Sequence, residues 1–168
     1  MIDEEVFFEV RGSLGLITLN RPKALNALTL SMVREIHPKL EEWESNPSVK
    51  NVLIKAEGEK AFCAGGDIRA LHDWGRNNDK EATGFYREEY FLNQYIKRYS
   101  KPYISLVNGI VMGGGVGLSV HGSYRIAGEN YSFAMPETGI GLFPDVGGSI
   151  FLPRLDYEAG TSLALTGN

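Results

Sequence analysis

Apolar and polar positions follow two patterns along the first part of the chain, one typical of strands and one typical of a helix. The apolar runs at residues 7–10 and 14–19 flank a Gly-Ser pair, which predicts a β-hairpin. Across residues 29–43 apolar side chains recur every three or four positions, the spacing of an amphipathic helix. Pro38 lies inside this stretch, so we expect it to kink the helix or to mark a junction.

The rest of the chain repeats the order strand, strand, helix. A longer helix is predicted over residues 85–99, where apolar positions again follow a helical period. Further strands are predicted at residues 49–56, 103–107, 124–127 and 131–134. The segments between them are rich in glycine and turn residues, and residues 165–168 are expected to be the end of a helix and its cap. This order indicates α/β or α+β layering in one domain.

Charge and cysteine content narrow the class of protein. With 17 basic and 21 acidic side chains, the net charge of -4 argues against charge-driven binding to nucleic acid or to anionic lipid. One cysteine and three histidines show neither a disulfide framework nor the spacing of metal ligands. No apolar run approaches the roughly 20 residues of a membrane span, and the acidic start of the chain is unlike a signal peptide. We therefore expect a soluble, cytoplasmic protein without a metal, although a processed protein of the mitochondrial matrix would look the same.

Glycine is the unusual component of the sequence. It accounts for 20 of 168 residues, about 12% against a usual level of about 7%. More than half of the glycines lie in residues 109–148, most densely at residues 113–117, after a predicted strand and before a predicted helix. A P-loop is excluded because no lysine follows, and a dinucleotide fingerprint is weak because Leu118 takes its last position. The segment suits an oxyanion hole, in which backbone N–H groups face a carbonyl oxygen, but tight packing of strand on helix explains the glycines equally well.

Two side chains resemble nucleophiles without the context of one. Ser119 falls in a sequence that misses the G-x-S-x-G nucleophile elbow by one residue, because His121 replaces the final glycine. We expect Ser119 to be an ordinary helix residue. Cys63 has no histidine near it in sequence, so we expect a small buried thiol.

Two carboxylates lie among apolar residues and glycines instead of among charged neighbours. Glu137 follows a proline, and Asp145 does the same eight residues later. Burial would raise the pKa of each carboxyl toward neutrality, as acid–base chemistry requires. For Asp145 the alternative is equally good, since it would also serve as the N-cap of a helix that begins at Val146.

Three segments together resemble the crotonase (enoyl-CoA hydratase/isomerase) superfamily over the whole length of the chain. They are AFCAGGDI at residues 61–68, NGIVMGGG at residues 108–115, and NRPKALNA at residues 20–27. The resemblance implies that the N–H groups of Gly66 and Gly114 hold the oxygen of a coenzyme A thioester. The other substrate-binding residues that it implies are Lys23, Ala24, Ala64, Asp67 and Ile68.

Within the superfamily, the carboxylates favour a thioester hydrolase over a hydratase. The hydratases have a catalytic glutamate where this chain has Gly117, and their second glutamate matches Glu137. Residues 87–90, 112–122 and 133–148 closely resemble the branch that hydrolyses 3-hydroxyisobutyryl-CoA in valine catabolism. That resemblance implies that Glu89, Gly114, Glu137 and Asp145 line the acyl site.

The resemblance also sets expectations for the fold and the partners. It implies an α/β fold, a spiral of β-β-α units truncated before its C-terminal helices, with residues 1–168 as the N-terminal core of a longer chain. An acyl-CoA is the expected substrate, with coenzyme A as part of it and no separate cofactor. The C-terminal remainder of the enzyme and further copies of the chain are expected partners. Two alternatives stay open: an enoyl-CoA hydratase or isomerase, and a catalytically silent acyl-CoA binder.

Overall fold

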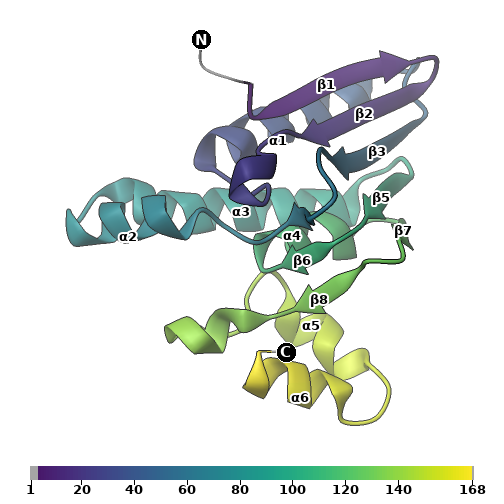
Figure 1. Cartoon of the computed structure of the whole chain (residues 1–168). Helices are drawn as coiled ribbons and strands as arrows, with labels where there is room; N and C mark the ends of the chain where they lie inside the picture. Colours follow the sequence, from purple (N-terminus) through teal and green to yellow (C-terminus); the bar gives the residue numbers. More distant parts are fainter. Residues whose placement is uncertain (1–3, 168) are drawn as a thin grey trace.

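The computed structural model describes residues 4–167 as strands arranged in two sheets with helices packed on them (Figure 1). The larger sheet has the order β1-β2-β3-β5-β7 and the smaller one the order β4-β6-β8. The strands of the larger sheet are β1 (Val6–Arg11), β2 (Leu14–Leu19), β3 (Asn51–Ala56), β5 (Tyr103–Val107) and β7 (Tyr124–Ala127). Those of the smaller sheet are β4 (Ala61–Cys63), β6 (Ile110–Met112) and β8 (Ser132–Ala134).

Successive pairs of strands are divided between the two sheets. β1 and β2 form the predicted antiparallel hairpin, and every later pairing is parallel. The first strand of each later pair (β3, β5, β7) extends the larger sheet, and the second (β4, β6, β8) extends the smaller one. This repeat confirms the predicted spiral of β-β-α units.

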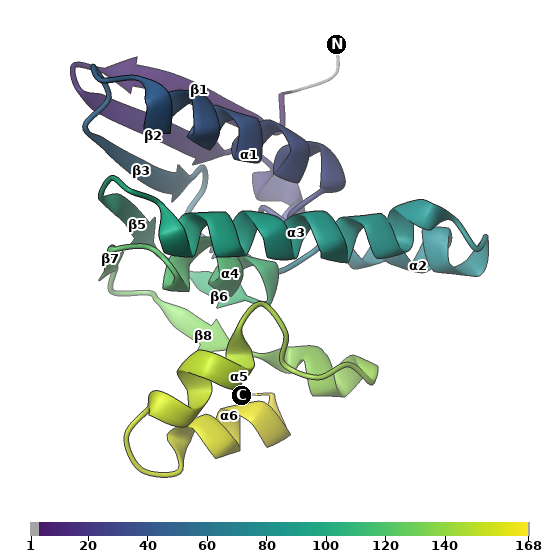
Figure 2. The ribbon, with the colours of Figure 1, turned by 180° about the vertical axis from the view of Figure 1, so that it is seen from behind.

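Helices follow these strand pairs. They are α1 (Leu30–Ser45), α2 (Ile68–Arg76), α3 (Lys80–Arg98), α4 (Gly114–Val120), α5 (Gly148–Phe151) and α6 (Ala159–Thr166). Short 3-10 turns occupy Pro22–Ala24, Pro136–Ile140 and Leu152–Arg154. Seen from behind, α1 and α3 lie across the same face of the larger sheet (Figure 2).

The first long helix forms as predicted, except at its proline. The Thr29 hydroxyl caps its start by accepting a hydrogen bond from the N–H of Met32 at 3.1 Å. The expectation of a junction at Pro38 is wrong, because α1 continues through it as one helix to Ser45, and the alternative of a kink stays a prediction. Ile36 and Leu40, on either side of the proline, are fully buried, and packing of this apolar face offsets the hydrogen bond that the proline removes.

The second long helix places polar side chains in the core. The helix predicted over residues 85–99 is confirmed as α3, which starts five residues earlier than predicted, at Lys80. Its buried face carries Phe85, Leu92 and Ile96, as the helical period requires, but also Glu89 and Asn93. Because the other buried side chains of this face are apolar, the burial of these two polar side chains requires a separate explanation.

Two short strands were not predicted from the sequence, whereas the C-terminal helix end was. The glycine-rich segments contain β4 and β6, which were missed because each has only three residues and lies next to glycines and turn residues. The predicted helix end is confirmed, since α6 ends at Thr166 and Gly167 caps it with φ of 74°. Residues 1–3 of the predicted acidic start, and Asn168, lie outside the described residues. Within residues 4–167, no helix has the length and apolar character to cross a bilayer, and no group of three or more potential ligand side chains is placed to hold a metal ion.

The buried face of α3 gives a direct test of this packing. Leu92 is fully buried, whereas its neighbour Phe91 is exposed. Leu92→Ala should lower the free energy of unfolding by about 2–5 kcal/mol, because it leaves a cavity in the core. Phe91→Ala is the matched control and should change it by less than about 1 kcal/mol. Urea denaturation measures both, and equal effects would contradict the assigned orientation of α3.

Candidate active site

The three parallel strands of the smaller sheet bring the predicted site residues together at one edge. β4 leads to Gly66, β6 leads to Gly114, and β8 leads to Glu137. The carboxyl ends of parallel strands meet at the same edge of a sheet, where α/β proteins bind their ligands. Residues that are far apart in the sequence therefore meet because the spiral repeats.

A cavity of about 160 Å³ lies at this edge. Glu89 enters it from α3, and Asp145 enters it from the segment between the 3-10 turn at Pro136–Ile140 and α5. Since one water takes up about 30 Å³, the cavity has room for a small acyl group. Its lining comprises Ala64, Gly65, Gly66, Ile68, Leu71, Phe85, Tyr86, Glu89, Gly113, Gly114, Pro136, Glu137, Ile140, Leu142 and Asp145.

The backbones at Gly66 and Gly114 converge. Leu28 is bridged to Gly66 through the Gly65 carbonyl and the Asp67 N–H, and in such a parallel bridge the N–H of the middle residue points to the opposite side. Gly114 is the first residue of α4, so its N–H has no partner within the helix. A Cβ built on Gly114 would lie 3.5 Å from the nitrogen of Gly66. The backbone of Gly114 therefore lies beside the amide of Gly66, where an oxyanion hole would require two N–H donors.

Glu137 has the properties expected of a catalytic carboxyl. Its residue is 6% exposed, and its Oε2 has no hydrogen-bond partner among the described residues. Burial, reinforced by the charge of Asp145, raises the pKa of Glu137 to about 7. Its Oε1 lies 3.0 Å from the position of a Cβ on Gly113, so the glycine segment leaves room for the carboxyl.

Glu89 is the most deeply buried acid of the cavity. It is 2% exposed, and burial, with the charges of Asp145 and Glu137 as smaller causes, raises its pKa to about 8. At neutral pH the carboxyl of Glu89 is therefore mostly protonated and can donate a hydrogen bond. A Cβ on Gly114 would collide with its Oε1, so a larger residue there would push the carboxyl out of its position.

Asp145 is held by a tyrosine and not by a helix end. The Tyr90 hydroxyl donates a hydrogen bond to Oδ2 of Asp145 at 2.6 Å. Burial raises the pKa of Asp145, and the Tyr90 hydrogen bond partly opposes that shift. The capping alternative is wrong, since α5 begins at Gly148 and its N-cap is Gly147. Sequence reasoning missed Tyr90 as a partner because 55 positions separate it from Asp145.

The space beside Gly117 is already filled. A Cβ on Gly117 would lie 2.7 Å from both Nδ2 and Oδ1 of Asn93, which projects from α3. A glutamate at residue 117 would therefore have to displace Asn93, whose amide occupies the space next to Gly117.

The remaining predicted substrate-binding residues divide into two groups. Ala64 and Ile68 line the cavity. Lys23, Ala24 and Asp67 do not, and the carboxylate of Asp67 is instead held by Arg21 at 3.0 Å and caps α2 through the N–H of Ala70.

The two rejected nucleophiles have structural roles. The Ser119 hydroxyl is buried in α4 and donates to the carbonyl of Gly115 at 2.9 Å. Cys63 is fully buried, and burial raises the pKa of its thiol to about 12. Both interpretations from the sequence are confirmed, since neither group is activated.

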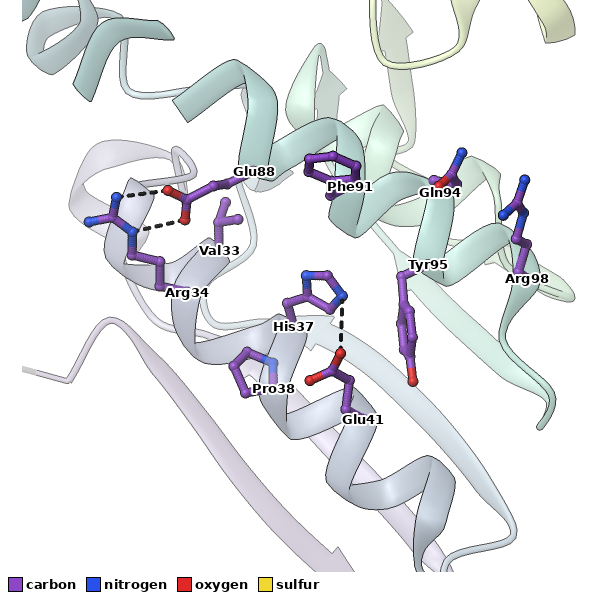
Figure 3. Close-up of a pocket in the computed structure, with 10 residues that line it drawn as sticks. All are labelled: Val33, Arg34, His37, Pro38, Glu41, Glu88, Phe91, Gln94, Tyr95 and Arg98. Atoms are coloured by element: carbon purple, nitrogen blue, oxygen red, sulfur yellow. Dashed lines mark hydrogen bonds and ion pairs between the residues drawn. The ribbon is translucent and has the colours of Figure 1, made fainter. Parts of the chain in front are cut away.

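A second cavity, of about 500 Å³ between α1 and α3, lacks such groups (Figure 3). Both of its carboxylates lie near a basic side chain. Arg34 binds both carboxylate oxygens of Glu88, at 2.8 and 2.7 Å, and this hydrogen bonding lowers the pKa of Glu88. His37 approaches Glu41 at 3.9 Å. The carboxyls with pKa values raised toward neutrality lie in the cavity at the strand ends, which is therefore the candidate active site.

Comparison with known proteins gives the family. The sequence profile described as Enoyl-CoA hydratase/isomerase matches residues 14–168. A relative from Danio rerio named "3-hydroxyisobutyryl-CoA hydrolase, mitochondrial" is 61% identical over 163 residues, which are 97% of this chain and 43% of the relative. The Homo sapiens protein of the same name is 58% identical over 98% of this chain and 42% of its own length. The chain thus spans less than half the length of these curated relatives.

Solved structures agree on the fold. A structure titled as an enoyl-CoA hydratase from Rhodobacter sphaeroides 2.4.1 superposes with a TM-score of 0.95 at 48% identity, covering 98% of this chain and 49% of that one. A structure titled as a carnitinyl-CoA dehydratase from Mycobacterium thermoresistibile superposes with a TM-score of 0.96 at 47% identity, covering 98% of this chain and 48% of that one.

The buried carboxyls predict how stability depends on pH. The folded pKa values of Glu89 and Glu137 lie above the value of 4.5 for a free glutamate. The folded state therefore binds protons more tightly, and stability should fall as the pH rises from about 4.5 to about 8. Glu89→Gln should flatten this dependence and raise the melting temperature at about pH 8.5 by roughly 2–4 °C for each kcal/mol of stability gained.

The adjacent Glu88 supplies the control. Its pKa is lowered by Arg34, so Glu88→Gln should not flatten the pH dependence of the melting temperature. Thermal melts between about pH 5 and about pH 8.5 decide the matter. A Glu89→Gln variant with the unaltered pH dependence of the native protein would show that Glu89 is not buried as described.

Proposed function

The chain belongs to the enoyl-CoA hydratase/isomerase family, and from this premise we propose that it hydrolyses a short-chain 3-hydroxyacyl-CoA thioester. The proposed substrate is 3-hydroxyisobutyryl-CoA, which yields 3-hydroxyisobutyrate and free coenzyme A. The observation that carries the proposal is the cavity that Glu89, Glu137 and Asp145 line together with the neighbouring backbones of Gly66 and Gly114. The names of the curated relatives support the same substrate.

The glycine amides would stabilise the charge that develops during hydrolysis. When the thioester carbonyl is attacked, its oxygen becomes negative, and the N–H groups of Gly66 and Gly114 donate to it. One such donor typically contributes roughly 3–4 kcal/mol to the stability of the transition state. The amides belong to the backbone at a sheet edge, so they need no rearrangement to act.

Glu137 is the proposed reacting carboxyl. With its pKa raised to about 7, much of it is ionised at neutral pH while it remains basic enough to accept a proton. In one route Glu137 takes a proton from water, the water oxygen bonds to the carbonyl carbon, and the carbon–sulfur bond breaks. In the other, Glu137 attacks the carbon itself, and water then hydrolyses the resulting anhydride. Both routes expel the thiolate of coenzyme A, which takes up a proton.

Asp145 and Glu89 would act on the acyl group and its protons. Asp145 is fixed by Tyr90 through one oxygen, and its other oxygen is available to orient the substrate hydroxyl or to move a proton. Glu89, mostly protonated at neutral pH, adds an uncharged carboxyl to the same cavity. Lys23, Ala24 and Asp67 lie outside the cavity lining, and we assign them to the coenzyme A portion. No separate cofactor takes part.

A hydratase or dehydratase is the second candidate, because the solved structures from Rhodobacter sphaeroides and Mycobacterium thermoresistibile have such titles. Addition of water across a double bond uses two acid–base groups, and the matching glutamate of the hydratases falls at Gly117. Asn93 fills that space here. This packing favours hydrolysis.

The remaining proposals concern the whole protein. Because the chain spans about 43% of its Danio rerio relative, we take residues 1–168 as the N-terminal core of a longer enzyme whose remainder packs on it, and which forms homo-oligomers. The relatives are named mitochondrial, which supports the mitochondrial matrix as the compartment of a eukaryotic protein.

Substitution of the two carboxylates tests the mechanism. In the intact protein, Glu137→Gln and Asp145→Asn should each lower the release of free coenzyme A from 3-hydroxyisobutyryl-CoA by at least about 100-fold. A thiol reagent follows the release. Glu129→Gln, at an exposed position in the turn before β8, is the control and should keep full activity. Native-like activity of either variant would remove that residue from the mechanism.

The pH dependence of the rate tests the state of Glu137. Because the ionised carboxyl is the reactive form in both routes, kcat/KM should rise with pH to a plateau, with its midpoint near 7. Below the midpoint it should fall about tenfold for each pH unit. Acid unfolding does not explain such a fall, since protonation of these carboxyls stabilises the fold. A rate independent of pH from about 5 to about 8 would contradict the assignment.

A further inference from the structure

The packing of α3 on α4 is built around two polar side chains. Glu89 and Asn93 are four residues apart and lie on the same buried face of α3. Two glycines of α4 lie against them: a Cβ on Gly114 would collide with Glu89, and a Cβ on Gly117 would collide with Asn93. Core helices usually pack apolar side chains at such positions, so this pairing of acid and amide with glycine indicates a specific role.

The amide of Asn93 lacks the partners that burial demands. Asn93 is 5% exposed, and neither its Nδ2 nor its Oδ1 has a hydrogen-bond partner within residues 4–167. The same holds for Oε1 of Glu89. Buried amides and carboxyls almost always have partners, and where protein groups do not supply them an internal water does. Side chains four residues apart on a helix are separated by about 5–6 Å at Cβ, a spacing that one water can bridge.

We propose that Asn93 is a positioning residue for Glu89. Its amide binds an internal water that also hydrogen-bonds to Oε1 of Glu89, and this water fixes the orientation of the carboxyl in the acyl cavity. Asn93 is not part of the cavity lining, so it acts through Glu89 and does not touch the substrate. It borders the adjacent cavity of about 490 Å³, together with Tyr90 and Asp145, from which water can enter.

The chemistry of Glu89 explains why such a water is needed. A carboxyl with a pKa of about 8 carries a proton at neutral pH, and a buried proton donor needs an acceptor. The water accepts that hydrogen bond and passes one on to Oδ1 of Asn93. The amide also has a donor, so the water can reverse its orientation when Glu89 loses its proton.

The vibrational spectrum of the carboxyl tests the proposal without reference to activity. In the intact protein at about pH 6, the carbonyl stretch of protonated Glu89 is assigned by its loss in Glu89→Gln. Asn93→Leu has a similar size and no hydrogen-bonding group, so it should remove the water and move the band to higher frequency. Asn93→Ser should return the band toward its native position. Gln94→Leu, on the exposed side of the same turn, should leave it unchanged.

Kinetics supply the second readout, which rests on the proposed function. Loss of the positioning water should lower kcat for thioester hydrolysis about tenfold in Asn93→Leu with little change in KM, the effect of one lost hydrogen bond. Asn93→Ser should recover part of kcat, and Gln94→Leu should keep the native value. If the native protein releases no coenzyme A, the proposed function fails while the band shift still supports the positioning role.

An unmoved band in Asn93→Leu overturns the proposal, whatever the kinetics. If Asn93→Leu does not fold, Asn93→Val takes its place in the same comparison with Asn93→Ser. A band that is the same in the valine and serine variants would equally overturn it.

Discussion

The close approach of backbone to buried carboxyl groups, which only glycine permits, is the constraint on which this site depends. Residues 113–117 bring α4 against three neighbours at once. Gly115 lets α4 touch the backbone of Cys63 on β4, Gly114 makes room for Glu89, and Gly117 makes room for Asn93. A methyl group at residue 115 would collide with the backbone of Cys63, and one at residue 114 or 117 would displace the side chain of Glu89 or Asn93. Each change would disturb the site that we propose for the thioester oxygen.

The same packing determines the chemistry of the acids. Glu89, Glu137 and Asp145 are all less than one-tenth exposed, so each carboxyl is deprived of water and is close to other negative charges. Burial raises their pKa values and makes their ionised forms costly, which lowers stability at neutral pH but keeps a carboxyl basic enough to act there. Tyr90 and, as we propose, Asn93 fix the orientation of these groups, so that the acyl cavity is ordered before a substrate enters.

Much of this could be predicted from the sequence because it depends on local signals. The hairpin and the long helices follow from apolar periodicity, and Glu137 and Asp145 are conspicuous as acids among apolar residues.

What escaped prediction depends on contacts between distant segments. β4 and β6 are short segments beside glycines that show no clear alternation of apolar and polar residues. Their strand conformation depends on pairing within the smaller sheet. Tyr90 and Asp145 come into contact only in the folded chain. Burial of Asn93 likewise depends on its packing against Gly117, which the sequence alone does not reveal. Periodicity places Glu89 on the same helix face as Phe85 and Leu92, and the family resemblance gave it an expected role in the acyl site.

We propose that these acids cleave a thioester and do not hydrate a double bond. The most direct measurement gives the intact protein 3-hydroxyisobutyryl-CoA and crotonyl-CoA side by side, following free thiol in the first and loss of the conjugated double bond in the second. We expect rapid release of thiol from 3-hydroxyisobutyryl-CoA and an unchanged double bond in crotonyl-CoA. Hydration of crotonyl-CoA without release of thiol from 3-hydroxyisobutyryl-CoA would contradict the proposal.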